Sequence, residues 1–568
     1  MLGKKSIRIN GADCGAESIV LGAVTSIGGF LFGYDTGQIS GMLLFRDFKD
    51  RFGQEDTPNG REFRPIIQSL LVSLMSIGTL FGALTASYTA DWFGRRKSLS
   101  FGVAIFIIGN IIQITAVNSW VHMMMGRFVA GLGIGNLSVG VPMLQSESSP
   151  REIRGAIIAS YQLAITIGIL VANIINYGVR NLEDSAASWR IVIGLSIAFS
   201  LPLGIGVLFV PESPRWLAAR ERWDDARMSM ARLRGVKDEP ENPFVKRDLK
   251  EMRDILEKER AVGIGSWAEC FFKSRKNGNA VPKQVYRTYL GLAIHFLQQW
   301  TGVNYFFYYG ATIFQSAGID DPIRTQLILG AVNVAMTFFG IYVVERFGRR
   351  MPLIWGAAWQ AGWLAVFAAV GTALLGPEKT DSDGTGNRAA GIVMIIAACM
   401  FIASFAITWG PICWVVVGET FPLRTRAKQA SLATAGNWLG NFLLSFLTPL
   451  ATAGIHYAFG FVFVATNILG LLVVYFFLYE SVSLSLENVD AMYGDPDVNA
   501  RNSKRWVPLG YNTRKQRRGD DQGLGGADMN GGALENGNEA PSVGTESLEK
   551  KESGAPSEGR VERVDRAL

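Results

Sequence analysis

Long apolar blocks separated by short polar stretches dominate the chain between residues 19 and 478. A block of ~20 apolar residues is long enough to cross the hydrocarbon core of a bilayer as a helix. About twelve such blocks occur, near residues 19–41, 66–89, 99–117, 120–142, 155–177, 189–210, 286–314, 325–344, 352–375, 390–417, 429–453 and 458–478. The pattern predicts an all-α membrane protein with twelve transmembrane helices.

Two longer polar stretches divide these blocks into groups. A short N-terminal stretch, residues 1–18, precedes the first apolar block. Residues 211–285 then separate the six blocks of residues 19–210 from the six blocks of residues 286–478. The runs WDDARMSMARLRG and FVKRDLKEMRDILEKERAV predict short amphipathic helices within this linker. From residue 491 the chain is polar and has little apolar periodicity, so we predict that 479–568 is a largely disordered tail, able to bind cytoplasmic regulators.

Charge adds an orientation to this picture. The net charge is +6, the mean hydropathy is +0.20, and the basic residues flank the apolar blocks, which argues against nucleic acid as a partner. The loops at 94–98, 149–154, 211–285, 346–351 and 423–428 are all basic, and with twelve spans they share one side of the membrane. Because basic loops remain on the cytoplasmic side, we expect both termini to be cytoplasmic.

Little in the sequence indicates a metal site, a cofactor site or a catalytic site. Its four cysteines and three histidines have no metal or disulfide spacing, so we expect no metal site and no cofactor. No nucleophile-base pair or phosphate loop stands out either, and we therefore do not expect an enzyme.

The stretch Gln298–Tyr309, QQWTGVNYFFYY, concentrates amides and aromatic rings inside one apolar block. Polar groups in hydrocarbon are costly unless they face a protein cavity. Gln298 and Asn304 lie about 120° apart on an ideal helix, and a break at Gly302 would turn both toward one cavity. Amides beside flat aromatic faces suit a neutral ligand with many hydroxyls, which indicates a sugar. The alternative is that these groups only join helices in the membrane.

Asp35 and Arg127 are the charges that lie furthest inside apolar blocks. Each is six or seven residues from the outer end of its block, roughly 10 Å deep, so the two side chains are expected to pair. A buried carboxylate can exchange an arginine partner for a proton. We therefore predict a proton-coupling role for the pair, with a structural salt bridge between two helices as the alternative.

Three motifs recur in the same order in the two groups of blocks. DWFGRR at Asp91–Arg96 returns as ERFGRR at Glu345–Arg350, and PESPRW at Pro211 returns as YESVSL at Tyr479. An E-x2-P-x3-R spacing occurs at both Glu147 and Glu419. The repeat predicts two homologous six-helix bundles. The candidate residues for gate salt bridges are Asp91, Arg95, Arg96, Glu147, Arg154, Glu212, Arg215, Glu345, Arg349, Arg350, Glu419, Arg426 and Glu480.

These residues combine arginines with carboxylates at the cytoplasmic helix ends, where an arginine fork can hold a carboxylate bidentately. Ion pairs between the two bundles would close the inner side, and their breakage would open it. The alternative is that the pairs only fix topology and loop packing.

The motifs closely resemble those of the sugar porter family of the major facilitator superfamily, especially fungal hexose transporters. The resemblance covers roughly residues 15–490 and includes FGYDTGQISG, DWFGRRKS, GRFVAGLGIG, PESPRWL, QQWTGVNYFFYY, VERFGRR, WGPICWVVVGETFP and GNWLGN. It implies two pseudo-symmetric six-helix bundles with an intracellular helical domain, and alternating access around a central sugar site. A monomer is the family expectation.

The resemblance also implies site residues. Sugar hydroxyls are expected to meet Gln162, Gln298, Gln299, Asn304 and Asn333, and Trp414 is expected to stack on the sugar ring. Tyr308, Asn437 and Trp438 are expected to line the same cavity. In this family the Asp35–Arg127 pair marks proton symporters, although some fungal facilitators also keep the aspartate.

The resulting prediction is a plasma-membrane hexose transporter, with glucose as the expected sugar and proton symport as the expected mode. A facilitated-diffusion carrier and a non-transporting glucose sensor of the same fold are the alternatives.

Overall fold

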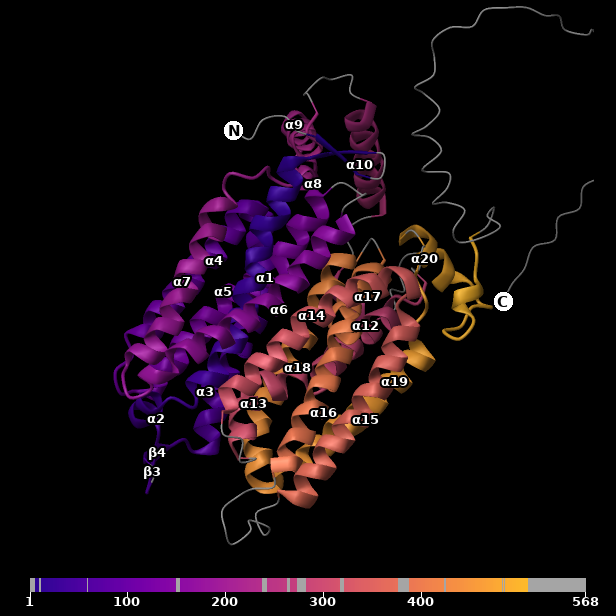
Figure 1. Ribbon diagram of the computed structural model, residues 1–568. Helices are drawn as coiled ribbons and strands as arrows, with labels where there is room; N and C mark the ends of the chain where they lie inside the picture. Colours follow the sequence, from indigo (N-terminus) through magenta and orange to yellow (C-terminus); the bar gives the residue numbers. More distant parts are fainter. Residues whose placement is uncertain are drawn as a thin grey trace, which may run out of the picture.

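The computed structural model describes residues 6–508, apart from 10–11, 59, 150–153, 237–242, 263–265, 273–281, 317–320, 376–387, 423–424, 483 and 485. Two helical bundles stand side by side (Figure 1). The N-terminal bundle contains α1 (Ala16–Met42), α3 (Pro65–Phe93), α4 (Arg95–Ile114), α5 (Trp120–Ser148), α6 (Arg154–Val179) and α7 (Ala187–Gly206). The C-terminal bundle contains α12 (Gln284–Gln299), α13 (Val303–Ser316), α14 (Pro322–Phe347), α15 (Arg350–Leu374), α16 (Arg388–Ile407), α17 (Trp409–Thr420), α18 (Arg426–Ile455) and α19 (Gly460–Phe477).

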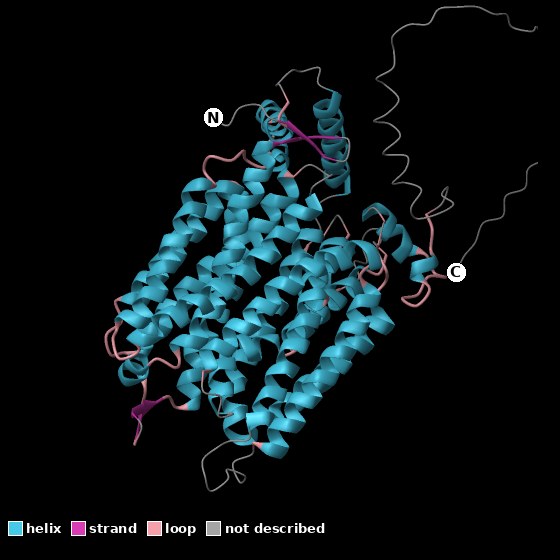
Figure 2. Cartoon of the chain, viewed as in Figure 1, coloured by secondary structure: helices cyan, strands magenta, loops and turns pink. Residues whose placement is uncertain are grey.

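Short elements mark the two ends of the molecule. At one end, which we call the linker end, lie α8 (Pro214–Ala219), α9 (Trp223–Arg234), α10 (Pro243–Val262), α11 (Trp267–Phe271), α20 (Leu486–Gly494) and η3 (Ser503–Arg505). The hairpin of β1 (Ser6–Ile9) and β2 (Ala12–Gly15) packs there against α9. The opposite end, called the far end, carries α2 (Arg46–Phe52), η1 (Arg180–Leu182), η2 (His456–Phe459), and the hairpin of β3 (Glu55–Thr57) and β4 (Gly60–Glu62) (Figure 2).

Ten stretches of the described residues are helical, long and apolar enough to cross a membrane. One of them, Lys428–Phe477, contains both α18 and α19. The helices α12 and α13 are not among the ten, because they have only 16 and 14 residues. With α18 and α19 counted separately and α12–α13 counted as one broken span, the described helices account for the twelve crossings that the sequence predicts.

The two bundles repeat one packing scheme. Helix α1 packs on α6 as α12 packs on α18, and α4 packs on α7 as α15 packs on α19. Glycine permits the close α1–α6 contact: a Cβ on Gly33 would lie 1.9 Å from the Ile165 carbonyl oxygen, and a Cβ on Gly168 would lie 2.2 Å from that of Phe30. Across the interface, α3 meets α18 and α6 meets α14. The pseudo-symmetric arrangement expected from the sequence repeat is therefore present.

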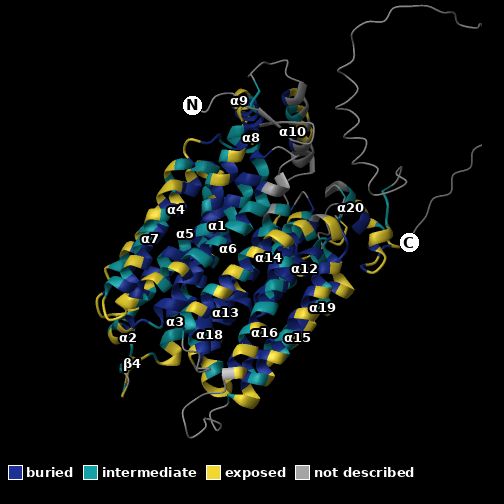
Figure 3. Ribbon diagram, in the orientation of Figure 1, coloured by how far each residue is buried: buried dark blue, intermediate teal, exposed yellow. Residues whose placement is uncertain are grey.

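Burial follows the expectation for a protein in lipid. Large apolar side chains on the outer helix faces are exposed, such as Phe81, Ile108, Phe338 and Ile396, whereas the helix faces between the bundles are buried (Figure 3). Polar residues gather inside, which is the arrangement that a hydrocarbon solvent favours.

The prediction of a disordered tail does not hold for its first part. Helix α20 and the residues around it form a separate small core of Tyr479, Val489, Met492, Tyr493, Val498 and Ala500. The fully buried guanidinium of Arg287 on α12 forms an ion pair with Asp490 and lies 4.1 Å from the ring of Tyr493. The apolar residues here are too few and too irregularly spaced to give a periodic signal. Residues 509–568 lie outside the described residues.

Candidate functional site

The break expected at Gly302 is present, and it shapes the centre of the C-terminal bundle. Helix α12 ends at Gln299 and α13 begins at Val303. Gly302 has φ +102°, a conformation that L side chains rarely adopt, and a Cβ there would lie 2.9 Å from the ring of Phe463. The interruption leaves amide side chains on both sides of one unwound turn.

Four buried amides form a continuous hydrogen-bonded chain at this break. Asn304 donates to Gln299 at 2.6 Å, and Gln299 donates to Asn437 at 2.9 Å. Asn437 in turn donates to the Gln298 side chain at 2.7 Å. Gln298 then donates to the carbonyl oxygens of Trp409 at 2.8 Å and Gly410 at 3.1 Å, where α17 begins. The chain thus joins α12, α13, α17 and α18, and amides of this kind can exchange such bonds for sugar hydroxyls.

Two tryptophans lie close to the amide chain. Trp414 on α17 is half-buried, and its ring meets His295 edge to face at 4.7 Å between centroids. Trp438 on α18 follows Asn437 directly, and its buried indole nitrogen has no hydrogen-bond partner. Its ring meets Phe32 of the N-terminal bundle at 5.1 Å. The site therefore offers aromatic surface and an unused donor at the junction of the bundles.

The remaining predicted residues lie at the bundle interface. Gln162 on α6 is half-buried and Asn333 on α14 is buried, on two helices that pack against each other, but neither is hydrogen-bonded to the amide chain. Tyr308 on α13 is buried next to Asn441. Sequence reasoning missed Asn441, whose side-chain oxygen accepts a 3.1 Å hydrogen bond from Ser76 of the other bundle. The sequence signal that could have identified Asn441 is its position at the end of GNWLGN, one helical turn after Asn437.

Asp35 and Arg127 form the expected pair inside the N-terminal bundle. Both are fully buried, and an Asp35 carboxylate oxygen lies 3.5 Å from an Arg127 guanidinium nitrogen. Gln38, which sequence reasoning missed, donates to the other Asp35 oxygen at 2.6 Å. The Nε and Nη1 atoms of Arg127 have no hydrogen-bond partner. An ion pair this long and this incompletely satisfied is an expensive arrangement in a buried site.

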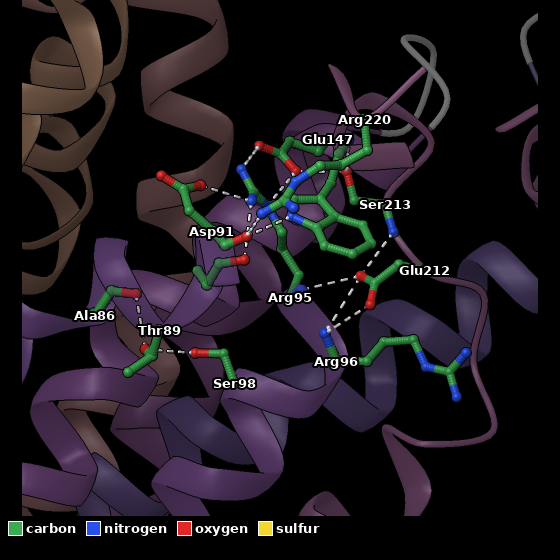
Figure 4. Close-up of polar contacts among 12 residues, drawn as sticks. Ala86, Thr89, Asp91, Arg95, Arg96, Ser98, Glu147, Glu212, Ser213 and Arg220 are labelled. Atoms are coloured by element: carbon green, nitrogen blue, oxygen red, sulfur yellow. Dashed lines mark hydrogen bonds and ion pairs between the residues drawn. The ribbon is translucent and has the colours of Figure 1, made fainter. Parts of the chain in front are cut away.

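The first repeat motif closes the linker end of the N-terminal bundle (Figure 4). Arg95 holds Glu147 bidentately, with distances of 2.9 and 3.0 Å, and also contacts Asp91 at 3.0 Å. The Glu212 carboxylate accepts the backbone N–H of Arg95 at 3.1 Å. Ser213 donates its hydroxyl to Glu147 at 2.5 Å. The arginine at the start of α4 is thereby tied to the end of α5 and to the chain entering α8.

The second motif repeats this geometry in the C-terminal bundle. Arg349 holds Glu419 bidentately at 2.7 and 3.0 Å, and Glu480 accepts the backbone N–H groups of Arg349 and Arg350 at 3.0 Å. Ser481 donates to Glu419 at 2.7 Å, as Ser213 does to Glu147. The two serines were not predicted. They could have been found from the shared Glu-Ser pair of PESPRW and YESVSL.

The expectation that these motifs pair across the bundles is not met by Arg95 and Arg349. Each binds a carboxylate of its own bundle, because the motif loop and the end of α5 or α17 are neighbours within one six-helix unit. Other predicted residues bind backbone: Arg96 donates to the Val207 carbonyl, Arg350 to that of Tyr475 and Arg426 to that of Phe421. Arg215 helps to line a cavity of about 310 Å³ with Asp91, Arg95 and Glu147. The side chains of Arg154 and Glu345 lie outside the described residues.

An ion pair between the bundles occurs instead at the far end. Arg180, in η1 after α6, lies 2.6 Å from Asp321, which caps the start of α14. Nearby, Asn173 donates to the Gln326 carbonyl at 3.2 Å. The Ser40 hydroxyl accepts the backbone N–H of Ala311 at 3.3 Å. We call these three contacts the far-end seam. Only Ser40 lies in one of the motifs described above, and no sequence pattern pairs the partners of these contacts.

The chain is similar in sequence to known sugar transporters. The family model described as "Sugar (and other) transporter" matches residues 21–493. A low-affinity glucose transporter of Kluyveromyces lactis is 40% identical over 485 residues, which covers 85% of this chain and 84% of that protein. The high-affinity glucose transporter ght5 of Schizosaccharomyces pombe is 39% identical over 525 residues, which covers 91% of this chain and 92% of that protein.

Solved structures lead to the same fold. The proton:xylose symporter XylE bound to 6-bromo-6-deoxy-D-glucose is 25% identical, with a TM-score of 0.69, covering 84% of this chain and 99% of that chain. XylE from E. coli in a partially occluded inward open conformation is 24% identical, with a TM-score of 0.66, covering 82% and 99% of the two chains. Both are proteins of the major facilitator fold. The chain described here belongs to the sugar transporter family and is a transporter rather than an enzyme.

Proposed function

We propose that this transporter carries hexoses, with glucose as the first candidate, by alternating access of the two bundles to a shared site. The chain of four buried amides at the α12–α13 break is the observation that carries this proposal. Each amide both donates and accepts, so a neutral polyol can replace the internal bonds without leaving a buried group unpaired. The fungal relatives that are named glucose and hexose transporters support the same substrate class.

Gln298, Gln299, Asn304 and Asn437 would bind sugar hydroxyls, and Trp414 would cover an apolar face of the ring. Trp438, through its unpartnered indole nitrogen, would add a donor to the same site. Gln162, Asn333 and Tyr308 would contribute from the interface, where the ligand can hold both bundles at once. Movement of one bundle against the other would then change the side from which the sugar is reached.

Proton symport is the mode that we infer for this carrier. In the fully buried Asp35–Arg127 pair, protonation of Asp35 would remove the charge that holds Arg127 and free the guanidinium to move. The similarity to the proton:xylose symporter XylE supports this inference. We further propose that the protein is a monomer in the plasma membrane, with the basic linker end on the cytoplasmic side.

The first test is uptake of labelled glucose by cells that lack their own hexose carriers, with and without a protonophore. Uptake that accumulates sugar and collapses with the protonophore is the expected result. Uptake that only equilibrates and ignores the protonophore would replace symport with facilitated diffusion. No uptake despite surface expression would favour a sensor of the same fold and overturn the transport proposal.

The far-end seam should control access to the site from its side of the membrane. Reversing one charge, as Arg180→Asp or Asp321→Arg, removes an inter-bundle ion pair whose side chains are 36% and 28% exposed. Partly exposed pairs are worth up to about 1 kcal/mol, so opening should increase by about two- to fivefold. The measurement is the rate at which a membrane-impermeant maleimide labels Ser40→Cys in the seam.

The double reversal of Arg180 and Asp321 should return this labelling rate to that of the parent. The pair Arg46–Asp184 lies at the same end but within one bundle, and its reversal should leave the rate unchanged. Equal rates in all the variants would show that the seam does not control opening.

A further inference from the structure

Three basic side chains, Arg501, Lys504 and Arg505, are exposed in the last part of the described chain. They lie against the linker end of the C-terminal bundle, in the yellow segment of Figure 1. The guanidinium of Arg501 lies 5.2 Å from the ring of Tyr475 and 5.0 Å from that of Phe476, both in the last turn of α19. We call these three basic residues the basic cluster.

The position of α19 sets the depth of the basic cluster. Helix α19 belongs to an apolar membrane-spanning stretch that ends at Phe477, and Tyr475 and Phe476 are partly exposed on its outer surface. Aromatic side chains at the end of a spanning helix lie at the level of the lipid headgroups. Arg501, stacked on these rings, is therefore held at the boundary between hydrocarbon and water.

The segment that carries the basic cluster is fixed rather than loose. The buried hydroxyl of Ser503 accepts the backbone N–H of Glu480 at 2.9 Å. Trp506 donates its indole N–H to Asp495 at 3.0 Å, and the Asn502 side chain donates to the Asp497 carbonyl at 2.9 Å. The bonded residues lie between the basic residues and directly after them, so the backbone that carries the cluster is fixed before any ligand arrives.

Among the residues that the structure describes, no carboxylate forms an ion pair with Arg501, Lys504 or Arg505. A fourth cation is close by, because Arg350 donates to the Tyr475 carbonyl at 2.7 Å and its guanidinium lies 5.3 Å from the Tyr475 ring. Three cations at one place that form no ion pair with a described carboxylate favour an external anion.

We propose that Arg501, Lys504 and Arg505 form a binding site for the headgroups of anionic phospholipids in the leaflet at the linker end. A bilayer lipid fits better than a soluble anion, because the site adjoins aromatic rings that lie at the level of the lipid headgroups. Each basic residue near an anionic membrane surface raises the affinity for that surface about fivefold. Binding would hold residues 479–508 to the membrane, and with them Glu480, which caps the start of α15. This proposal does not depend on which sugar is carried.

The test uses the full-length protein in phosphatidylcholine vesicles that contain a trace of photoactivatable phosphatidylserine. After illumination, the lipid attached to the peptide around Arg501–Arg505 is quantified by mass spectrometry. Attachment should be strong for the parent protein and at least about tenfold weaker in the triple variant Arg501→Gln, Lys504→Gln, Arg505→Gln. Photoactivatable phosphatidylcholine should attach weakly and equally to both proteins.

The matched control is the triple variant Lys246→Gln, Lys250→Gln, Arg253→Gln, which removes the same charge from exposed positions of α10 at the same end. The amount of lipid attached to this control variant should equal the amount attached to the parent protein. A thermal unfolding midpoint equal to that of the parent shows that each variant is folded. Undiminished attachment in the first variant, equal loss in both, or displacement of the lipid by soluble glycerophosphoserine would each overturn the proposal.

Discussion

Replacing Asp35 with asparagine should reduce the accumulation ratio of sugar, inside over outside, to about one. The free energy of accumulation is RT ln of that ratio, and it is zero when proton coupling performs no work. Asparagine keeps the size of the side chain and a hydrogen-bond acceptor for Gln38, but it cannot change charge when a proton binds. Arg127 would lose its counter-charge in every state of the cycle. The measurement is the steady-state ratio of inner to outer labelled sugar under an imposed pH gradient, with sugar exchange measured in parallel.

Exchange should persist in Asp35→Asn, since it needs the sugar site but no net proton movement. Asp47→Asn is the control: Asp47 also pairs with an arginine in the N-terminal bundle, at 2.7 Å from Arg51, but it lies at the far end in α2. Its variant should accumulate sugar like the parent. An unchanged accumulation ratio in Asp35→Asn would refute the coupling role and leave Asp35–Arg127 as a structural ion pair.

Replacing Gln298 with alanine should raise the KM for sugar uptake by about tenfold or more. The substitution removes the acceptor for Asn437 and the donor that holds the start of α17. A buried polar group left unpaired costs about 1–3 kcal/mol, and each 1.4 kcal/mol is a factor of ten in affinity. The measurement is the KM of uptake in cells, with the maximal rate normalised to the amount of protein at the surface.

A matched variant separates binding from packing. Gln360 on α15 is also fully buried in the C-terminal bundle and bonds to Thr408, but it is not part of the amide chain. Gln360→Ala should lower the amount of folded protein and leave the KM unchanged. If both variants lose surface protein equally and neither changes the KM, the amide chain serves helix packing rather than sugar binding.

The sequence predicted the membrane-spanning helices because a bilayer leaves the backbone few alternatives. Every N–H and C=O group in hydrocarbon must be bonded, so an apolar block of sufficient length becomes a helix. Buried charge was predictable for the same reason: Asp35 and Arg127 stand at similar depths in apolar blocks, and no cheaper arrangement than pairing is available to them. The glycine of QQWTGVNYFFYY indicated the break between α12 and α13, because glycine adopts backbone conformations that suit few other residues. In the structure Gly302 has such a conformation, with φ +102°.

Partners that lie far apart in the sequence were accessible only in part. Gln298 and Asn304 were brought together by local reasoning about one helix, whereas Asn437 entered the site only through a family resemblance. The structure alone decided that Gln299 and Asn437 connect them in order. It also decided that Arg95 and Arg349 bind within their own bundles, because the end of the neighbouring helix is nearer than the opposite bundle.

The sequence by itself thus determined the number of helices, their repeat and the chemical character of the centre, since each follows from the solvent and from local geometry. Only the tertiary structure decided the far-end seam at Arg180–Asp321 and the packing of residues 486–508 against Arg287. Both depend on a few contacts between segments without apolar periodicity. Such contacts become favourable only after the bundles have brought the partners together and removed water from around them.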